Sequence, residues 1–281
     1  MKSYLNLGCG SRFHPDWTNA DFTSGDPSII SCNLRAGIPF PENSFDVVYH
    51  SHVLEHFARS EANAFLRECH RVLKKRGVIR IVVPDLESLA RTYLHALEQA
   101  SERDPQWEQN YEYLMLELFD QAVRDRPGGE LGDYLKQEQI PNLDFVIAQG
   151  GVDARNIIEQ ARQLARHSVH AANENRVWQL PLRIYRYLRR IGFGREVMLR
   201  LILQKEYDAL EVGRFRRRGE PHLWMYDRYS LLKTLRDAGF ENPQLFSAAE
   251  SQVPNWTDFC LDTETDGTVY KPYSLYAEAQ K

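Results

Sequence analysis

The sequence has 281 residues, 43% hydrophobic and 26% charged, which is typical of a globular protein with a sizeable core. Its formal net charge of -4 argues against a protein that coats nucleic acid, because such domains are usually strongly basic. The four cysteines are scattered without a Cys-x-x-Cys pair, which fits a reducing compartment and neither a disulfide framework nor a cysteine zinc site. There is no signal-peptide apolar region and no run near the roughly 18 apolar residues of a membrane span. We therefore expect a cytoplasmic protein.

The first 90 residues alternate between strand and helix patterns. Short apolar segments predict strands at 4–7, 17–20, 29–32, 45–49 and 78–83. Before the last of these, apolar residues recur at a spacing of three to four and predict a helix capped by Ser60 and ended by Gly77. Strands joined through a helix imply right-handed crossovers and a parallel sheet.

The last 62 residues return to the same pattern. Asp227 can cap a helix that ends at Gly239, and strand-like segments follow near 244–248 and 274–278. The middle of the chain instead carries apolar residues at helical spacing, at Trp107–Leu118, Ile157–Leu164 and Ile184–Ile191, with glycine breaks between the helices.

Three parts are predicted from this division. Residues 1–90 would form the first, ligand-binding half of the core, residues 91–219 a helical insertion that forms a lid on the substrate side, and residues 220–281 the completion of the sheet. The predicted fold class is α/β: a doubly wound, mostly parallel, Rossmann-like sheet with a large helical insertion.

A glycine-rich turn follows the first strand. Gly8-Cys9-Gly10 comes directly after Leu7, and Asp21 ends the next strand. Such a turn lets the backbone contact a bound nucleotide, and the acid can accept hydrogen bonds from both ribose hydroxyls. A dinucleotide site would need a third glycine, where this chain has Phe13, and an acid about 20 residues downstream. Asp21 follows Gly8 by only 13 residues, which favours S-adenosylmethionine, a nucleoside without phosphate.

These motifs resemble the type-11 group of class I S-adenosylmethionine-dependent methyltransferases. The segments that carry the resemblance are LNLGCGS, IPFPENSFDVVYHSHVLEHF and ECHRVLKKRGVIRIVVPDLE, with PHLWMYD and KPYSLY near the other end. The chain is most similar to predicted methyltransferases whose first helix is shortened. The resemblance covers about 150 residues and leaves the insertion unmatched.

The resemblance implies a set of cofactor-binding residues at the strand ends: Leu7, Gly8, Cys9, Gly10, Asp21, Asn33, Leu34, His50 and Ser51. Within this set, Asp21 would hold the ribose, and Asn33-Leu34 would lie beside the adenine. The segment His50-Ser51-His52 would line the methionine side.

Histidines cluster just after the fourth strand. Methyl transfer needs a base only where the acceptor must lose a proton, and histidine suits this because its pKa lies near neutrality. His52 and His56 are therefore the candidate catalytic residues. Two alternatives stay open. His56 can instead cap or pack a helix, or His52-x-x-Glu55-His56 can bind a divalent metal, because related methyltransferases of small RNA and of quinone precursors use a similar glutamate-rich motif. We assign no metal ligand at this point.

Substrate residues are expected from the C-terminal part and from the insertion. By the resemblance, His222 and Tyr226 would approach the substrate side, whereas Trp224 suits core packing equally well. Residues 183–218 hold eleven Arg and Lys against four acids. This run is compatible with a phosphorylated or otherwise anionic acceptor, an acidic partner, a membrane surface or a solvated face.

We therefore expect a methyltransferase that uses S-adenosylmethionine and acts on a small-molecule or saccharide acceptor, with oxygen favoured over nitrogen. A nucleic-acid partner is not expected, and neither the acceptor nor the oligomeric state follows from the sequence. Two other classes remain as alternatives. An NAD-dependent sugar-modifying enzyme is disfavoured by Phe13, and a non-catalytic protein that keeps the fold to bind a partner would form no methylated product.

Overall fold

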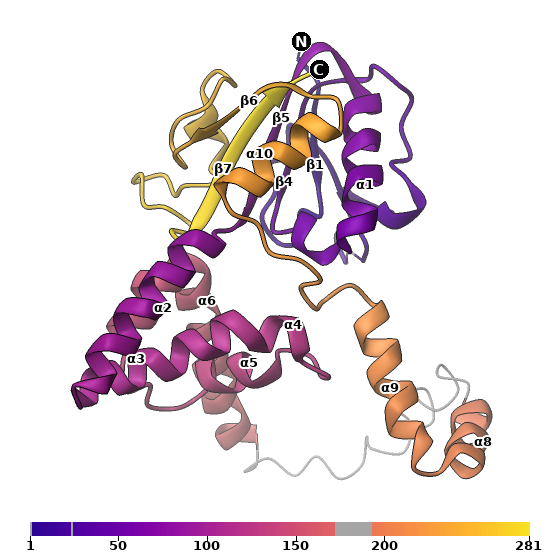
Figure 1. The fold of residues 1–281 in the computed structure, drawn as a ribbon. Coiled ribbons are helices and arrows are strands. Elements are labelled where there is room, and N and C mark those ends of the chain that lie inside the picture. The colour runs from indigo at the N-terminus through magenta and orange to yellow at the C-terminus, as the bar shows by residue number, and fades with distance from the viewer. Residues whose placement is uncertain (1, 24, 172–192) are drawn as a thin grey trace.

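The computed structural model describes residues 2–23, 25–171 and 193–281, and its centre is a seven-stranded sheet (Figure 1). The strands are β1 (Tyr4–Leu7), β2 (Thr18–Asp21), β3 (Ile29–Ser31), β4 (Phe45–Ser51), β5 (Leu73–Pro84), β6 (Glu241–Phe246) and β7 (Ser274–Gln280). Their order across the sheet is β3-β2-β1-β4-β5-β7-β6. Strands β1 to β5 are parallel, and β7 is antiparallel to both of its neighbours. The predicted α/β fold with a mostly parallel sheet is confirmed.

Two helices cover one face of this sheet. Helix α1 (Arg59–Val72) lies between β4 and β5, and helix α10 (Arg228–Asp237) precedes β6. As predicted, Asp227 caps α10, because its Oδ1 accepts a hydrogen bond of 2.8 Å from the Ser230 amide. The buried apolar side chains on this face form one cluster from both helices and five strands, including Leu5, Leu7, Val48, Phe65, Leu66, Ile81, Leu231 and Leu235.

The predicted end of the first helix is wrong. Helix α1 ends at Val72, and β5 begins at Leu73, so the residues before Gly77 belong to the strand. Two contacts explain the early change. Leu73 pairs with Phe45 of β4, and Lys74 Nζ forms an ion pair of 2.8 Å with Asp46 Oδ2.

The opposite face is covered by aromatic side chains of a long segment between β6 and β7. No helix separates β1 from β2, where residues 8–17 form turns, in keeping with the shortened first helix of the resemblance. Instead, Trp256 and Phe259, in the short 3-10 helix η5 (Trp256–Phe259), pack on Trp17. Tyr49 of β4 lies 5.2 Å from Trp256, measured between ring centroids.

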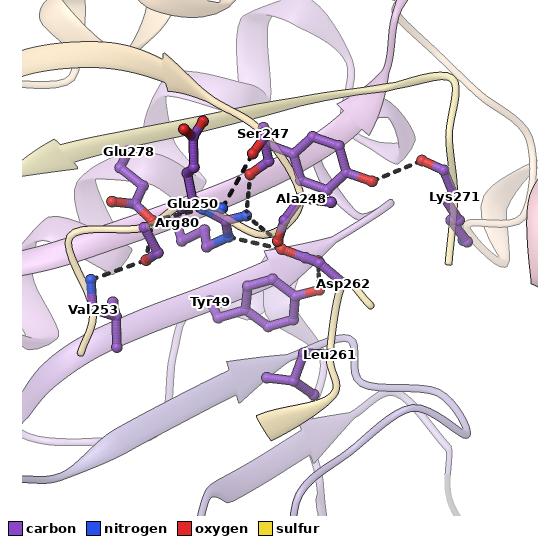
Figure 2. A network of polar contacts seen from close by, with 12 residues as sticks. Tyr49, Arg80, Ser247, Ala248, Glu250, Val253, Leu261, Asp262, Lys271 and Glu278 are labelled. Carbon is purple, nitrogen blue, oxygen red and sulfur yellow. Dashed lines mark hydrogen bonds and ion pairs between the residues drawn. The ribbon is translucent and has the colours of Figure 1, made fainter. Parts of the chain in front are cut away.

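A buried arginine attaches this segment to the sheet (Figure 2). The side chain of Arg80, in the middle of β5, is fully buried, and its Nε donates to Asp262 Oδ2 at 2.7 Å. Its Nη1 donates to Glu278 Oε1 of β7 at 2.7 Å. The remaining donors bind three backbone carbonyl oxygens, of Ser247, Ala248 and Glu250. One guanidinium therefore holds the start and the end of the covering segment.

The insertion consists of helices that follow β5. They are α2 (Leu86–Ser101), α3 (Pro105–Met115), α4 (Gln121–Val123), α5 (Gly129–Leu135), α6 (Leu143–Ala171), α8 (Phe193–Leu203) and α9 (Glu206–Arg217), with a π-helical turn η3 (Leu116–Asp120). The expected helix around 184–191 lies outside the described residues, and the division at residues 90 and 219 stays a prediction. None of the helices in the described ranges is long and apolar enough to cross a membrane.

A kink in the insertion contacts the segment that leads into β7. Helix α6 bends at Gly151, where φ is 64° and ψ is -145°. A Cβ atom there would collide with Pro272 and with the Tyr270 carbonyl oxygen, so only glycine permits this approach. At the kink, the Val152 amide donates to that Tyr270 oxygen at 3.1 Å.

We predict that Arg80→Met lowers the free energy of unfolding by about 3–5 kcal/mol, because it leaves Asp262 and Glu278 buried without their counter-charge. Urea unfolding followed by circular dichroism measures this change. Arg91→Met is the matched control: Arg91 is 73% exposed and pairs with Glu87, so its loss should change stability by less than about 1 kcal/mol. Equal effects of the two substitutions would contradict the assigned role of Arg80.

Candidate active site

Two adjoining cavities lie at the carboxyl ends of the parallel strands. The first, of about 210 Å³, adjoins β1 and β4 and is called the strand-end cavity. The second, of about 500 Å³, is lined mainly by the insertion and is called the insertion cavity. Three residues line both of them: His52, Asp153 and Lys271. The strand order reverses between β1 and β4, which is the position at which open α/β sheets bind their ligands.

The glycine turn borders the strand-end cavity. Gly8 and Gly10 both have a positive φ, 63° and 53°. A Cβ at Gly8 would collide with Val53, so Gly8 is required by packing within the protein. A Cβ at Gly10 would meet nothing within 4 Å and would enter open space. The Gly10 amide donates to Asp21 Oδ2 at 2.7 Å, which ties the turn to the end of β2.

Of the predicted cofactor residues, four line the strand-end cavity: Gly8, Cys9, Gly10 and Ser51. His50 does not, because side chains alternate along a strand and His50 faces α1, where it is fully buried against Phe65. Burial lowers the pKa of His50 to about 3. Leu7 is likewise buried in the core beneath α1.

The other predicted cofactor residues lie beside the turn or further away. Asp21 touches the turn through Gly10 but does not line the cavity. Asn33 caps the short 3-10 helix η1 (Leu34–Ala36), accepting a hydrogen bond of 3.1 Å from the Arg35 amide. Leu34 lines a separate cavity of about 260 Å³ beside α1.

Side chains from distant parts of the chain, none of them predicted as a site residue, complete the strand-end cavity. Arg12 lies over the Tyr270 ring at 4.1 Å and pairs with Glu264 at 2.8 Å. The Tyr270 hydroxyl donates to Asp153 Oδ1 at 2.9 Å. Lys271 Nζ lies 3.5 Å from Asp153 Oδ2. The one signal for this group was the KPYSLY segment, which begins at Lys271.

His52 lies between the two cavities. It directly follows β4 and has a left-handed conformation, with φ of 54°. Its Nε2 is 3.0 Å from Ser274 Oγ, and its Nδ1 is 3.3 Å from Oε1 of the fully buried Glu55. Burial lowers the pKa of His52 and raises the pKa of Glu55 to about 8. At neutral pH the imidazole is therefore uncharged, and one of its nitrogens can accept a proton.

His56 and His222 line the insertion cavity together. His56 lies in the short 3-10 helix η2 (Leu54–His56), and its ring centroid is 4.9 Å from that of His222. Burial lowers the pKa of both imidazoles, that of His222 to about 3. Tyr226 differs from the expectation: it is buried in the core among residues of α1 and α10 and lines neither cavity.

The basic run does not line the cavities within the described residues. Arg216 donates to the carbonyl oxygen of Ala122 at 3.1 Å, and Arg217 and Arg218 are exposed on α9 and at its end. The first four basic residues of the run, Arg183 to Arg190, lie outside the described ranges. The cationic side chains at the insertion cavity are Arg124, Lys136 and Lys271.

Part of the sheet domain is similar to a known protein family. Residues 17–81 match the family model described as "Methyltransferase domain". This match confirms the predicted resemblance for this part of the chain, and the cofactor of such domains is S-adenosylmethionine. No curated protein resembles the chain closely enough to count as a match.

Solved structures of low identity are also similar. The 1,6-didemethyltoxoflavin-N1-methyltransferase of Burkholderia thailandensis, bound to S-adenosylhomocysteine, is 18% identical over 30% of this chain and 45% of its own, with a TM-score of 0.26. The YcgJ protein of Bacillus subtilis is 21% identical over 33% of this chain and 52% of its own, with a TM-score of 0.26. The chain thus spans about half the length of these two. An S-adenosylmethionine-dependent methyltransferase of Archaeoglobus fulgidus is 10% identical over 100% of this chain and 86% of its own, with a TM-score of 0.36.

We predict that Gly10→Ala weakens S-adenosylmethionine binding at least tenfold, because Gly10 lines the strand-end cavity and the added methyl group occupies the open space beside it. The free energy of unfolding of the Gly10→Ala protein should fall by only about 1–2 kcal/mol, the cost of an alanine in a left-handed conformation. Gly8→Ala is the comparison: it should destabilise the fold further through its collision with Val53. Calorimetric titration and thermal unfolding measure the two effects. If Gly10→Ala binds the cofactor as the wild type does, the cofactor does not contact this turn.

Proposed function

We propose that the protein transfers the methyl group of S-adenosylmethionine to a hydroxyl group of a small-molecule or saccharide acceptor. One observation carries the proposal: His52 lines both cavities, so a base stands where a donor in the strand-end cavity would meet an acceptor in the insertion cavity. A cytoplasmic location is part of this proposal and is supported by the unpaired cysteines of the described chain.

The residues around the strand-end cavity fit the cofactor. The methyl donor has no phosphate, and this cavity offers a glycine turn and the Asp21 carboxylate at its border. That carboxylate accepts one bond from Gly10 and retains lone pairs for ribose hydroxyls. Tyr270 and Lys271 also line this cavity. When bound, S-adenosylmethionine supplies an activated methyl group, and the protein contributes alignment and exclusion of water.

The base would act on the acceptor. His52 lies between two polar groups, with Glu55 Oε1 3.3 Å from its Nδ1 and Ser274 Oγ 3.0 Å from its Nε2. An acceptor hydroxyl that takes the place of the Ser274 contact would deliver its proton to Nε2 of the neutral imidazole. Glu55 would keep the ring oriented through Nδ1. Oxygen acceptors need such a proton transfer, which favours O-methylation over N-methylation of an already neutral amine.

The insertion cavity suits a small polar acceptor. Its volume of about 500 Å³ lies within the usual range for small-ligand sites. Apolar side chains such as Leu89, Leu131 and Ile157 line it together with Arg124 and Lys136. This mixture supports an acceptor with an apolar body and a polar or anionic group.

The two alternative classes make different predictions. An NAD-dependent enzyme would need a pyrophosphate cradle at a helix N-terminus, and residues 8–17 form no helix. A non-catalytic protein would bind S-adenosylmethionine without consuming it.

We expect His52→Gln to slow methyl transfer by about 10²–10⁴-fold while S-adenosylmethionine affinity changes little, because a glutamine amide cannot accept the proton. The release of S-adenosylhomocysteine is measured over a panel of hydroxylated small molecules and sugars. His95→Gln, at an exposed position of α2, is the control. A His52→Gln enzyme as fast as the wild type would exclude His52 as the base. A wild type that binds the cofactor but methylates no acceptor would favour the non-catalytic alternative.

A further inference from the structure

Three potential metal ligands meet beside His52. They are Glu55 and His56 of η2 and His222 of the segment before α10, and one ligand atom from each lies within 4.8 Å of the other two. Glu55 is fully buried, whereas both imidazoles line the insertion cavity. The sequence motif had suggested a different set, with His52 in place of His222.

The backbone holds the two segments in register. The amides of Leu223 and Trp224 both donate to the Glu55 carbonyl oxygen, at 2.7 and 3.2 Å. The His222 amide donates to the Gln121 carbonyl oxygen at 2.8 Å. Backbone hydrogen bonds, and not side-chain contacts alone, therefore place His222 near Glu55 and His56.

The carboxyl group of Glu55 is buried without a hydrogen-bond partner. Within the described residues, neither of its carboxyl oxygens makes a hydrogen bond, and His52 Nδ1 lies 3.3 Å from Oε1. A buried carboxyl group without partners is costly and is normally paired or bound to a metal.

The orientation of His56 also suits a metal ligand. His56 Nδ1 lies 3.2 Å from the Pro221 carbonyl oxygen. A hydrogen on Nδ1 donates to that oxygen and leaves Nε2 unprotonated. Metal-binding histidines are usually held in this way, with one ring nitrogen bonded to a backbone carbonyl and the other facing the ion.

We propose that Glu55, His56 and His222 bind one divalent transition-metal ion, such as Zn²⁺, on the wall of the insertion cavity. Two imidazoles and one carboxylate are a ligand set that such ions accept, whereas Mg²⁺ and Ca²⁺ prefer oxygen ligands alone. Because both imidazoles face the cavity, the remaining coordination positions open toward it, as in catalytic metal sites.

The role of this ion rests on the proposed function. An acceptor hydroxyl that binds the ion would be more acidic and would lie next to His52. Its proton would pass to Nε2 of His52, and the oxygen would form a bond to the methyl carbon. The electrons of the broken carbon–sulfur bond would return to sulfur, giving S-adenosylhomocysteine.

The test is a titration of the full chain with Co²⁺ after chelator treatment, followed by visible absorption, with neither cofactor nor acceptor present. One equivalent should bind, and Glu55→Gln and His222→Gln should each weaken binding about 100-fold. Glu55→Gln keeps the side-chain volume, and the circular dichroism of both variants shows whether they fold. His95→Gln should bind as the wild type does.

The variants also separate the two possible ligand sets. His52→Gln should weaken Co²⁺ binding less than His222→Gln does. The reverse order, or no stoichiometric binding by the wild type, would overturn the proposed site. Co²⁺ binding without methyl transfer would support the metal site and contradict the proposed function. Methyl transfer that survives chelation, in a protein that binds no Co²⁺, would support the proposed function and contradict the metal site.

Discussion

The structure depends on one buried charge. Arg80 lies in the middle of the sheet, yet its guanidinium is fully paired with Asp262, Glu278 and three carbonyl oxygens. Asp262 also accepts a hydrogen bond of 2.6 Å from the Tyr49 hydroxyl, and Tyr49 lines the strand-end cavity. Removing one partner of such a buried group leaves the others unsatisfied, so the network acts as a unit. Arg80 therefore attaches the covering segment to the sheet and, through Asp262, also fixes the position of Tyr49 in the strand-end cavity.

The segment after this network connects the two cavities. Tyr270 accepts hydrogen bonds at its carbonyl oxygen from the kinked helix α6, and its side chain faces Arg12 and Asp153. Lys271 lines both cavities, and Ser274 contacts His52. The insertion is thus tied to the sheet at the place where donor and acceptor would meet. A change in the position of α6 would therefore alter both the strand-end cavity and the insertion cavity.

The sequence predicted the parts of the fold that depend on local pattern. Alternating apolar residues, the glycine turn and the Asp227 cap lie where they were expected, because each reflects geometry within a few residues. His50 was assigned to the wrong face, although strand alternation from Val48 predicts its burial. His222 and Asp153 could not be assigned their partners, since they reach the site from more than 100 residues beyond β4. The charge of Arg80 within an apolar strand was a usable signal for a buried network.

The aromatic covering of the second face affects how the chain must fold. Trp17 and Tyr49 belong to the first strands, but Trp256, which covers them, is made more than 200 residues later. Synthesis at roughly 5–20 residues per second leaves these rings without their native partner for on the order of 10 s or longer. The sheet also cannot be completed before β7 is available to enter between β5 and β6. Contacts this distant in sequence form slowly, so the nascent chain carries an exposed aromatic surface through most of its synthesis, and this surface is the part most prone to aggregate.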